Sequence, residues 1–183
     1  MEKSSWVRQM FEAGARLKAE HGDENVFDFS LGNPILEPPH QVHEQLRLLL
    51  ENPEHGMHRY MSNAGFEETR EFIAGVMRDE TGHPFGSEDV VMCVGAGGGL
   101  NVVFKALLEA GDEVLTFTPY FVEYGAYVQN HGGRLTLAKT NADFQPDLNS
   151  IEASLSEQTK IVIINSPNNP TGAVYSQQTL DEV

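Results

Sequence analysis

Several features that would point to particular classes of protein are scarce in this sequence. It has one cysteine, Cys93, so no disulfide can form within the chain, and the V-V-M-C-V context predicts a buried strand residue, not a nucleophile. Lysine and arginine together number 12, against 27 aspartates and glutamates. Because a phosphate backbone is held by clustered basic side chains, we expect no nucleic-acid partner.

Long apolar runs are also missing. The N-terminus, M-E-K-S-S-W-V-R, lacks the apolar segment of a secretory signal peptide, and no run reaches the length of a membrane span. We therefore predict no membrane association and a cytoplasmic location. The net charge of −15 comes from acidic residues scattered over the predicted helices, which indicates a solvated surface.

The length and the apolar content suit a soluble domain with a core of its own. The chain has 183 residues, of which 40% are hydrophobic. Its last residues, T-L-D-E-V, are typical of the first turn of an amphipathic helix. We therefore expect the chain to be the N-terminal part of a longer protein.

Hydrophobic periodicity predicts an α/β protein. From residue 89 onward, strands alternate with helices, which favours a mostly parallel sheet flanked by helices on both faces. The predicted helices cover residues 1–21, 39–50, 66–80, 100–108, 120–130 and 147–155. The predicted strands cover residues 26–31, 90–94, 114–118, 134–138 and 161–164.

The stretch K-I-V-I-I-N-S-P-N-N-P-T-G-A-V-Y, residues 160–175, organises the rest of the chain. Residues 161–164 are consecutive β-branched residues, which predicts a strand buried on both faces. The prolines, glycine and asparagines that follow force a turn, at the strand end where α/β sheets bind ligands. Asn169 can donate to a ligand oxygen there without carrying charge. Alternatively, Asn168, Asn169 and Thr171 only satisfy the backbone of the turn.

A second candidate site is the glycine-rich segment of residues 95–99. A strand, a glycine turn and a helix N-terminus form an anion site, because unpaired backbone N–H groups and the helix dipole point at the ligand. The G-x-G-x-x-G dinucleotide fingerprint fails, since Leu100 stands at its last position. Ala96, Gly97 and Gly98 would contribute backbone donors only. The alternative is that these glycines serve tight packing.

An aromatic residue follows the strand of residues 114–118. Phe121 lies in T-P-Y-F-V-E-Y, where its ring could stack on a flat heteroaromatic ligand. Such a stack contributes about 0.5–1.5 kcal/mol beyond the burial of area. Core packing is the competing interpretation.

The string N-N-P-T-G, after a buried strand and an N-S-P lead-in, resembles the signature of class I and II aminotransferases. These are fold-type I enzymes that use pyridoxal 5′-phosphate (PLP). With each residue near 5% usage, N-P-T-G occurs by chance in about one in a thousand chains of this length. The resemblance spans residue 27 to the C-terminus. It implies that residues 1–48 form an N-terminal arm and small-domain segment, and that residues 49–183 are the first part of the PLP-binding large domain.

The resemblance also implies roles for residues near the cofactor. The turn of Ala96, Gly97 and Gly98 would hold the phosphate of PLP, and Phe121 would stack on the pyridine ring. Asn169 would bind the phenolic oxygen of the cofactor and help to orient the substrate carboxylate. The family often holds the bonds Asn169–Pro170 and Thr118–Pro119 in the cis form.

Two further residues match positions of the family's site. Gly32 stands in an S-x-G-x-P setting whose backbone N–H meets the substrate carboxylate; alternatively it is a plain turn glycine. Tyr60 matches a tyrosine that reaches the cofactor phosphate of the neighbouring subunit, which implies a homodimer. Packing of a loop is the other role open to Tyr60.

The family's remaining catalytic residues are expected downstream of N-N-P-T-G. They are the Schiff-base lysine in an S-K or S-x-x-K setting, an acidic partner of the pyridine nitrogen, a second tyrosine and a carboxylate-binding arginine. None of the chain's lysines has such a context. We therefore predict no catalytic residue in this chain and no activity of the chain alone.

The implied activity of the full-length protein is PLP-dependent transfer of an amino group between an amino acid and a 2-oxo acid, in amino acid metabolism. A C–S lyase or decarboxylase on the same scaffold is an alternative, as is a non-catalytic PLP-fold module. The histidine pairs His40/His43 and His55/His58 have no further ligand at matching spacing, so no metal site is predicted.

Overall fold

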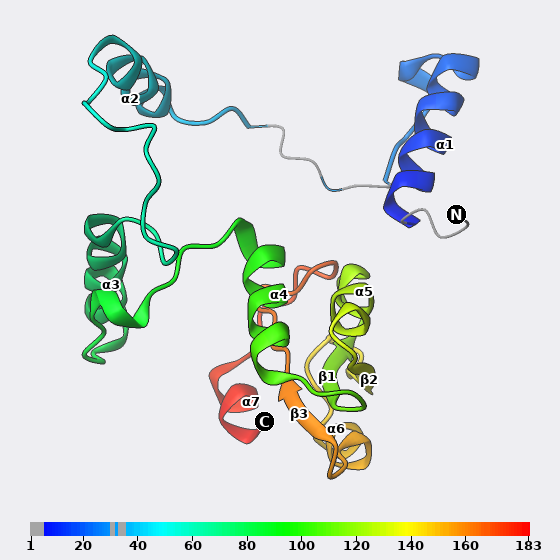
Figure 1. Ribbon diagram of the computed structural model, residues 1–183. Helices are drawn as coiled ribbons and strands as arrows, with labels where there is room; N and C mark the ends of the chain where they lie inside the picture. Colours follow the sequence, from blue (N-terminus) through cyan, green and yellow to red (C-terminus); the bar gives the residue numbers. More distant parts are fainter. Residues whose placement is uncertain (1–5, 30–31, 33–35) are drawn as a thin grey trace. The chain divides into compact units, whose positions relative to one another are not determined.

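The computed structural model describes residues 6–29, 32 and 36–183 (Figure 1). The chain forms two compact units, residues 1–60 and residues 61–183. Within the described ranges, no helix combines the length and the apolar content needed to cross a bilayer.

The described part of the first unit contains helices and no strand. It contains α1 (Trp6–His21), the 3-10 helix η1 (Asp23–Asn25) and α2 (His40–Glu51), so both helices predicted here are confirmed. The strand predicted over residues 26–31 is wrong for residues 26–29, which are irregular, with Phe27 83% and Phe29 93% exposed. Alternation alone does not make a strand when no neighbouring strand supplies hydrogen bonds. Residues 30 and 31 lie outside the described part of the chain.

A parallel sheet forms the centre of the second unit, as predicted. Its strands are β1 (Glu113–Thr118), β2 (Arg134–Lys139) and β3 (Thr159–Val162), in the order β2-β1-β3. Both pairings are parallel, and β1 pairs with β2 along its whole length. The C-terminal ends of the strands therefore lie at the same end of the sheet, which is called the sheet edge below, and the connecting turns begin there.

Helices cover both faces of this sheet. On one face, α4 (Gly95–Leu107) and α5 (Glu123–Asn130) pack with β1 through a buried cluster of Phe104, Val114, Tyr124, Val128 and Ile163. On the other face, α6 (Leu148–Ser154) and the segment before α7 (Gln177–Glu182) pack with the sheet through Leu115, Phe117, Ala138, Ile151 and Tyr175, and Leu180 of α7 packs against them. Successive residues of β1 thus point to opposite faces, as the pleat requires.

Two strand predictions need correction. Residues 90–94 are not a strand: Val94 is 94% exposed, Cys93 is exposed, and α4 begins directly at Gly95. The run VVMCV pairs with none of the described strands, so its backbone is not part of a ladder. The strand predicted over residues 161–164 is only partly correct, because β3 ends at Val162 and residues 163–164 lie beyond it. β3 is not buried on both faces, because Val162 is 39% exposed. Among the described strands, β3 is hydrogen-bonded to β1 alone, so one of its two sides is unpaired.

The helix α3 (Glu67–Thr81) and the 3-10 helix η2 (Ser87–Asp89) precede α4. The predicted helix is confirmed, and it ends at Gly82 in the left-handed conformation (φ 72°), which glycine adopts without a steric penalty. Arg70 ties the two helices together by donating to the Ser87 carbonyl at 2.5 Å. Two of the large apolar residues of this region, Phe66 and Val76, are 56% and 41% exposed.

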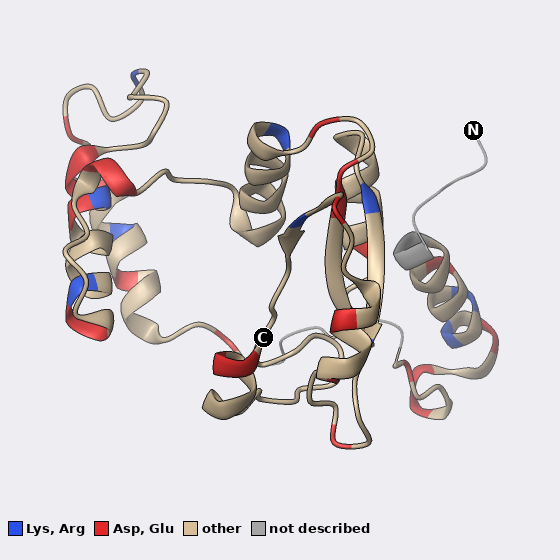
Figure 2. Ribbon diagram, turned by 90° about the horizontal axis from the view of Figure 1, so that it is seen from below, with Lys and Arg blue, Asp and Glu red and all other residues tan. Residues whose placement is uncertain are grey.

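Acidic side chains are spread over many elements of the ribbon (Figure 2), as predicted. Glu113 is different, because it is 3% exposed on the central strand. Its carboxylate accepts hydrogen bonds from Ser156 Oγ (2.8 Å) and Thr159 Oγ1 (3.4 Å) and pairs with Arg134 on β2. The Ser156 hydrogen bond, opposed by burial and supported by the charge of Arg134, lowers the pKa of Glu113 below its ordinary value of 4.5.

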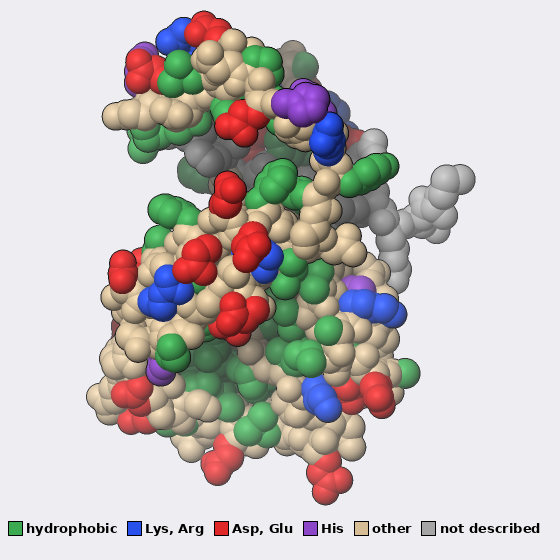
Figure 3. All heavy atoms as spheres, turned by 60° about the vertical axis from the view of Figure 1, so that its left-hand side comes forward, with side chains coloured by type: hydrophobic (Ala, Val, Ile, Leu, Met, Phe, Trp, Pro, Cys, Tyr) green, Lys and Arg blue, Asp and Glu red, His purple; other side chains and the backbone are tan. Residues whose placement is uncertain are grey.

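Large hydrophobic side chains also remain at the surface (Figure 3). In the second unit, Phe72 on α3, Val122 before α5 and Val174 are 73%, 57% and 65% exposed. In the first unit, the apolar stripe of α2 is exposed along its length, with Val42, Leu46 and Leu49 43%, 56% and 49% exposed. Clusters of exposed apolar side chains mark interaction surfaces, whereas single ones need no explanation.

We expect acid to weaken the second unit partly through Glu113. Because its pKa is lowered in the folded chain, Glu113 adds stability above its ordinary pKa and loses this contribution as the pH falls toward the lowered value. Chemical denaturation at a series of pH values should show a steeper loss below about pH 5 in the wild type than in Glu113→Gln. Glu109→Gln, at an exposed position, is the control and should keep the wild-type slope.

We also expect Phe104→Ala to destabilise the second unit by about 3–5 kcal/mol, because it leaves a cavity in the cluster between α4, α5 and β1. Phe72→Ala is the matched control at an exposed helix position, and we expect a change of no more than about 0.5 kcal/mol. Urea unfolding followed by circular dichroism measures both. Equal losses in the two variants would contradict the placement of the core.

Candidate functional site

The turn after β1 places Phe121 against the helix that follows. The Phe121 ring lies edge-on to Tyr124, with ring centroids 5.6 Å apart and planes at 79°. Its backbone carbonyl accepts a hydrogen bond from the Tyr124 N–H at 3.0 Å, which starts α5. Phe121 is half-buried and packs on the cluster between α4, α5 and β1. Part of its surface is therefore used in packing, and part remains open to a ligand.

The turn of residues 165–172 is held in place by Asn168, which is 7% exposed. Its side-chain nitrogen donates to the Pro119 carbonyl (3.1 Å) and to Thr171 Oγ1 (2.9 Å). The backbone of Asn168 also exchanges hydrogen bonds with Ala173 and Gly172. The structural role that the sequence left open is therefore correct for Asn168 and Thr171. The bond to Pro119 joins the turn after β3 to the turn after β1.

Asn169 lies in the same turn but has a different environment. It is exposed, and among the described residues its side chain has no hydrogen-bond partner. Its backbone N–H can donate to the side-chain oxygen of Asn165 at 3.0 Å, with the Asn165 amide oriented so that its nitrogen donates to the Pro167 carbonyl. The turn thus fixes the backbone of Asn169 and leaves its side-chain amide available. The peptide bonds Thr118–Pro119 and Asn169–Pro170 are cis, as expected, and so is Ser166–Pro167.

Tyr124 connects these two turns. Its ring contacts Phe121 and stacks on Tyr120, with centroids 6.4 Å apart. Burial raises the pKa of the Tyr124 hydroxyl, and a hydrogen bond with the Asn165 side chain offsets part of this effect. The hydroxyl is therefore protonated at neutral pH and can act as a donor.

The glycine-rich segment is the first turn of α4, not a turn that precedes a helix as predicted. Gly95 has φ 64°, and the preceding Val94 provides no side-chain cap. Among the described hydrogen bonds, the N–H groups of Ala96 and Gly97 have no backbone acceptor, as expected in a first turn. The N–H of Gly98 donates to the Val94 carbonyl at 3.2 Å, so it is partly used within the protein.

Gly97 faces the side chain of Tyr127 on α5. A β-carbon at this position would be 3.0 Å from the Tyr127 hydroxyl oxygen, so a larger residue would have to displace that side chain. The helix α5 therefore contacts the first turn of α4 through Tyr127 and the other two turns through Tyr124. The structure brings together the segments that carry Ala96, Gly97, Gly98, Phe121 and Asn169.

The other predicted residues lie in the first unit. Gly32 is exposed, and an added β-carbon would meet no atom within 4 Å. The rest of its S-x-G-x-P setting is outside the described residues. Tyr60 is fully exposed. The roles of Gly32 and Tyr60 stay predictions.

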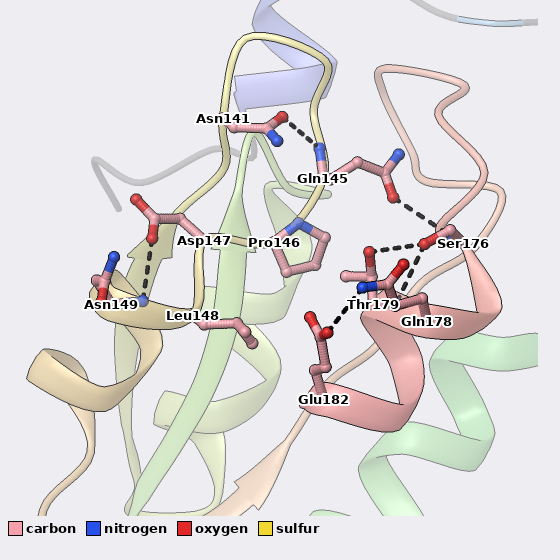
Figure 4. A pocket seen from close by; sticks show the side chains of 10 residues that line it. All are labelled: Asn141, Gln145, Pro146, Asp147, Leu148, Asn149, Ser176, Gln178, Thr179 and Glu182. Carbon is pink, nitrogen blue, oxygen red and sulfur yellow. Dashed lines mark hydrogen bonds between the residues drawn. The ribbon is translucent and has the colours of Figure 1, made fainter.

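A cavity of about 430 Å³ lies elsewhere in the second unit, between the loop before α6 and the helix α7 (Figure 4). Polar side chains dominate its lining, and several bond to each other, as Gln145 does to the Ser176 N–H at 3.1 Å and Gln178 to Glu182 at 3.0 Å. None of the predicted site residues lines it. In the described part of the chain, no group of three or more His, Cys, Asp and Glu side chains is arranged to hold a metal ion.

Tyr124 and Tyr127 contact these segments but were not predicted as site residues. A signal was present, because Tyr120, Tyr124 and Tyr127 recur at helical spacing directly after the strand, on the side of α5 that faces the sheet edge. Such a stripe is equally typical of core packing, so the sequence alone could not assign it.

Comparison with known proteins identifies the family. A family model described as aminotransferase class I and II matches residues 24–183. The aspartate aminotransferase of Thermotoga maritima is 36% identical over 179 residues, which are 96% of this chain and 46% of the relative. The aspartate/prephenate aminotransferase of Thermus thermophilus is 36% identical over 152 residues, 82% of this chain and 39% of the relative.

Solved structures give the same result. The crystal structure of an amino transferase from Eubacterium rectale superimposes with a TM-score of 0.92 at 38% identity, covering 99% of this chain and 46% of the other. The chain thus spans less than half the length of the relatives it matches. From the family match over most of its residues, the chain belongs to the class I and II aminotransferases.

Proposed function

We propose that the whole protein is a PLP-dependent aminotransferase that moves an amino group between an amino acid and a 2-oxo acid. The match of residues 24–183 to the family model carries this proposal. The names of the relatives, aspartate and aspartate/prephenate aminotransferase, favour aspartate as the amino donor. When bound, PLP supplies the electron sink that stabilises negative charge at the substrate's α-carbon.

The residues at the sheet edge fit this cofactor. The unpaired N–H groups of Ala96 and Gly97 and the dipole of α4 suit a phosphate, and the space under Tyr127 suits glycine. Gly98 would contribute more weakly, because its N–H already has an acceptor. The open part of the Phe121 ring suits a flat heteroaromatic ring.

In this proposal the residues of the chain bind the cofactor and orient the substrate. The Asn169 amide donates to the phenolic oxygen of the cofactor and helps to place the substrate carboxylate, because its side chain has no partner among the described residues. Gly32 offers its backbone N–H to the same carboxylate. The Asn165 side chain, which accepts from the Asn169 N–H and donates to the Pro167 carbonyl, holds the turn that carries Asn169. The lysine that binds the cofactor covalently would come from sequence beyond residue 183.

The assembly belongs to the same proposal. We propose a homodimer in which Tyr60 reaches the cofactor phosphate of the neighbouring subunit; its full exposure leaves the side chain free to do so. We also propose that residues 1–48 belong to the small domain and residues 49–183 to the large domain. The cytoplasmic location stays a prediction.

Transfer of a labelled amino group tests the activity directly. The protein extended to the family's length, given PLP, ¹⁵N-aspartate and a 2-oxo acid, should place ¹⁵N in the amino acid formed from the 2-oxo acid, as mass spectrometry can show. The 183-residue chain alone is the control and should transfer none. Release of ammonia, carbon dioxide or a thiol in place of transfer would favour a lyase or decarboxylase instead.

The neighbouring asparagines provide a matched pair that separates structure from binding. We expect Asn168→Ala to cost about 1–3 kcal/mol of unfolding free energy, because it leaves the Pro119 carbonyl without its partner. Asn169→Ala should leave stability within about 0.5 kcal/mol and weaken PLP binding. Thermal unfolding and titration with PLP measure the two effects. Unchanged PLP affinity in Asn169→Ala would remove Asn169 from the site.

A further inference from the structure

A polar link joins the first turn of α4 to the end of α5. The side-chain nitrogen of Asn101 lies 2.8 Å from the carbonyl oxygen of Gly97. The side-chain oxygen of Asn101 lies 3.0 Å from Nε2 of His131, the residue that ends α5. Asn101 and His131 are both half-buried, and none of the roles described so far uses them.

The direction of each hydrogen bond in this link is determined. A carbonyl oxygen can only accept, so the Asn101 amide must present its nitrogen to Gly97 and its oxygen to His131. His131 must then carry a hydrogen on Nε2 and donate it to Asn101. The link therefore runs from the imidazole N–H, through the Asn101 amide, to the Gly97 carbonyl.

The first turn of α4 has few local interactions that order its backbone, so the hydrogen bonds of this link add to its stability. Four of the five residues 95–99 are glycine, which loses more conformational freedom on folding than any other residue. The helix also has no side-chain cap at Val94. In addition, a hydrogen bond accepted by the Gly97 carbonyl polarises its peptide group and strengthens the N–H of Gly98 as a donor.

We propose that Asn101 and His131 are positioning residues that order the first turn of α4 for the phosphate group of the cofactor. This inference rests on the proposed function, since it assigns the link a role in the same site. It predicts that removal of the link loosens the turn in the free protein and selectively weakens recognition of the phosphate.

Three variants and one control test the link. His131→Leu removes the donor, His131→Gln keeps an N–H at a comparable reach, and Asn101→Leu breaks the link from the other side. His43→Leu, at an exposed position of α2, is the control. Amide hydrogen exchange of residues 96–99 is measured without ligand. The affinities for PLP and for pyridoxal, which lacks the phosphate, are measured by titration, and their ratio is compared.

We expect His131→Leu and Asn101→Leu to speed the exchange of these amides and to lower the PLP-to-pyridoxal affinity ratio about fivefold, the effect of one hydrogen bond of about 1 kcal/mol. His131→Gln should restore both values, and the control should change neither. Wild-type exchange and an unchanged ratio in both leucine variants would overturn the positioning role alone. A wild type that binds PLP no better than pyridoxal would overturn the phosphate site of the proposed function as well.

Discussion

The central strand β1 is paired on both edges and covered on both faces, and the rest of the second unit depends on this. Its side chains alternate between the α4–α5 layer and the α6–α7 layer, so one strand anchors two cores. Glu113, at its start, is bonded to groups that precede or begin the neighbouring strands, Arg134 on β2 and Ser156 and Thr159 near β3. The parallel pairing then places the turns after β1 and β3 at the same end of the sheet, where the strands' C-termini lie.

The turns at this edge are positioned by ordinary structural contacts. Asn168 joins two of them through the Pro119 carbonyl, and Tyr124 contacts Phe121 on one side and Asn165 on the other. Among the described residues, the side-chain amide of Asn169 in the same turn has no hydrogen-bond partner. A rigid turn with one available amide is suited to binding, because little conformational entropy remains to be lost when a ligand arrives.

Much of the fold followed from periodicity, and the errors have a common cause. The helices and the strands β1 and β2 were predicted because each has a one-sided or fully buried apolar pattern. Residues 26–29 and 90–94 have strand-like patterns but no neighbouring strand in the described chain to bond with. The exposed stripe of α2 shows a similar limit, since an apolar pattern predicts a helix without stating what covers it.

The sequence by itself determined the family and the local chemistry: the N-N-P-T-G turn, the glycine-rich segment and the aromatic residue after β1 are all local features of a few residues. Tertiary structure decided which asparagine of the turn is structural and which is available, because burial of Asn168 depends on Pro119, 49 positions earlier in the chain. It also decided that Asn101 and His131 meet. Contacts between residues far apart in sequence depend on how helices pack, and no local pattern encodes that distance.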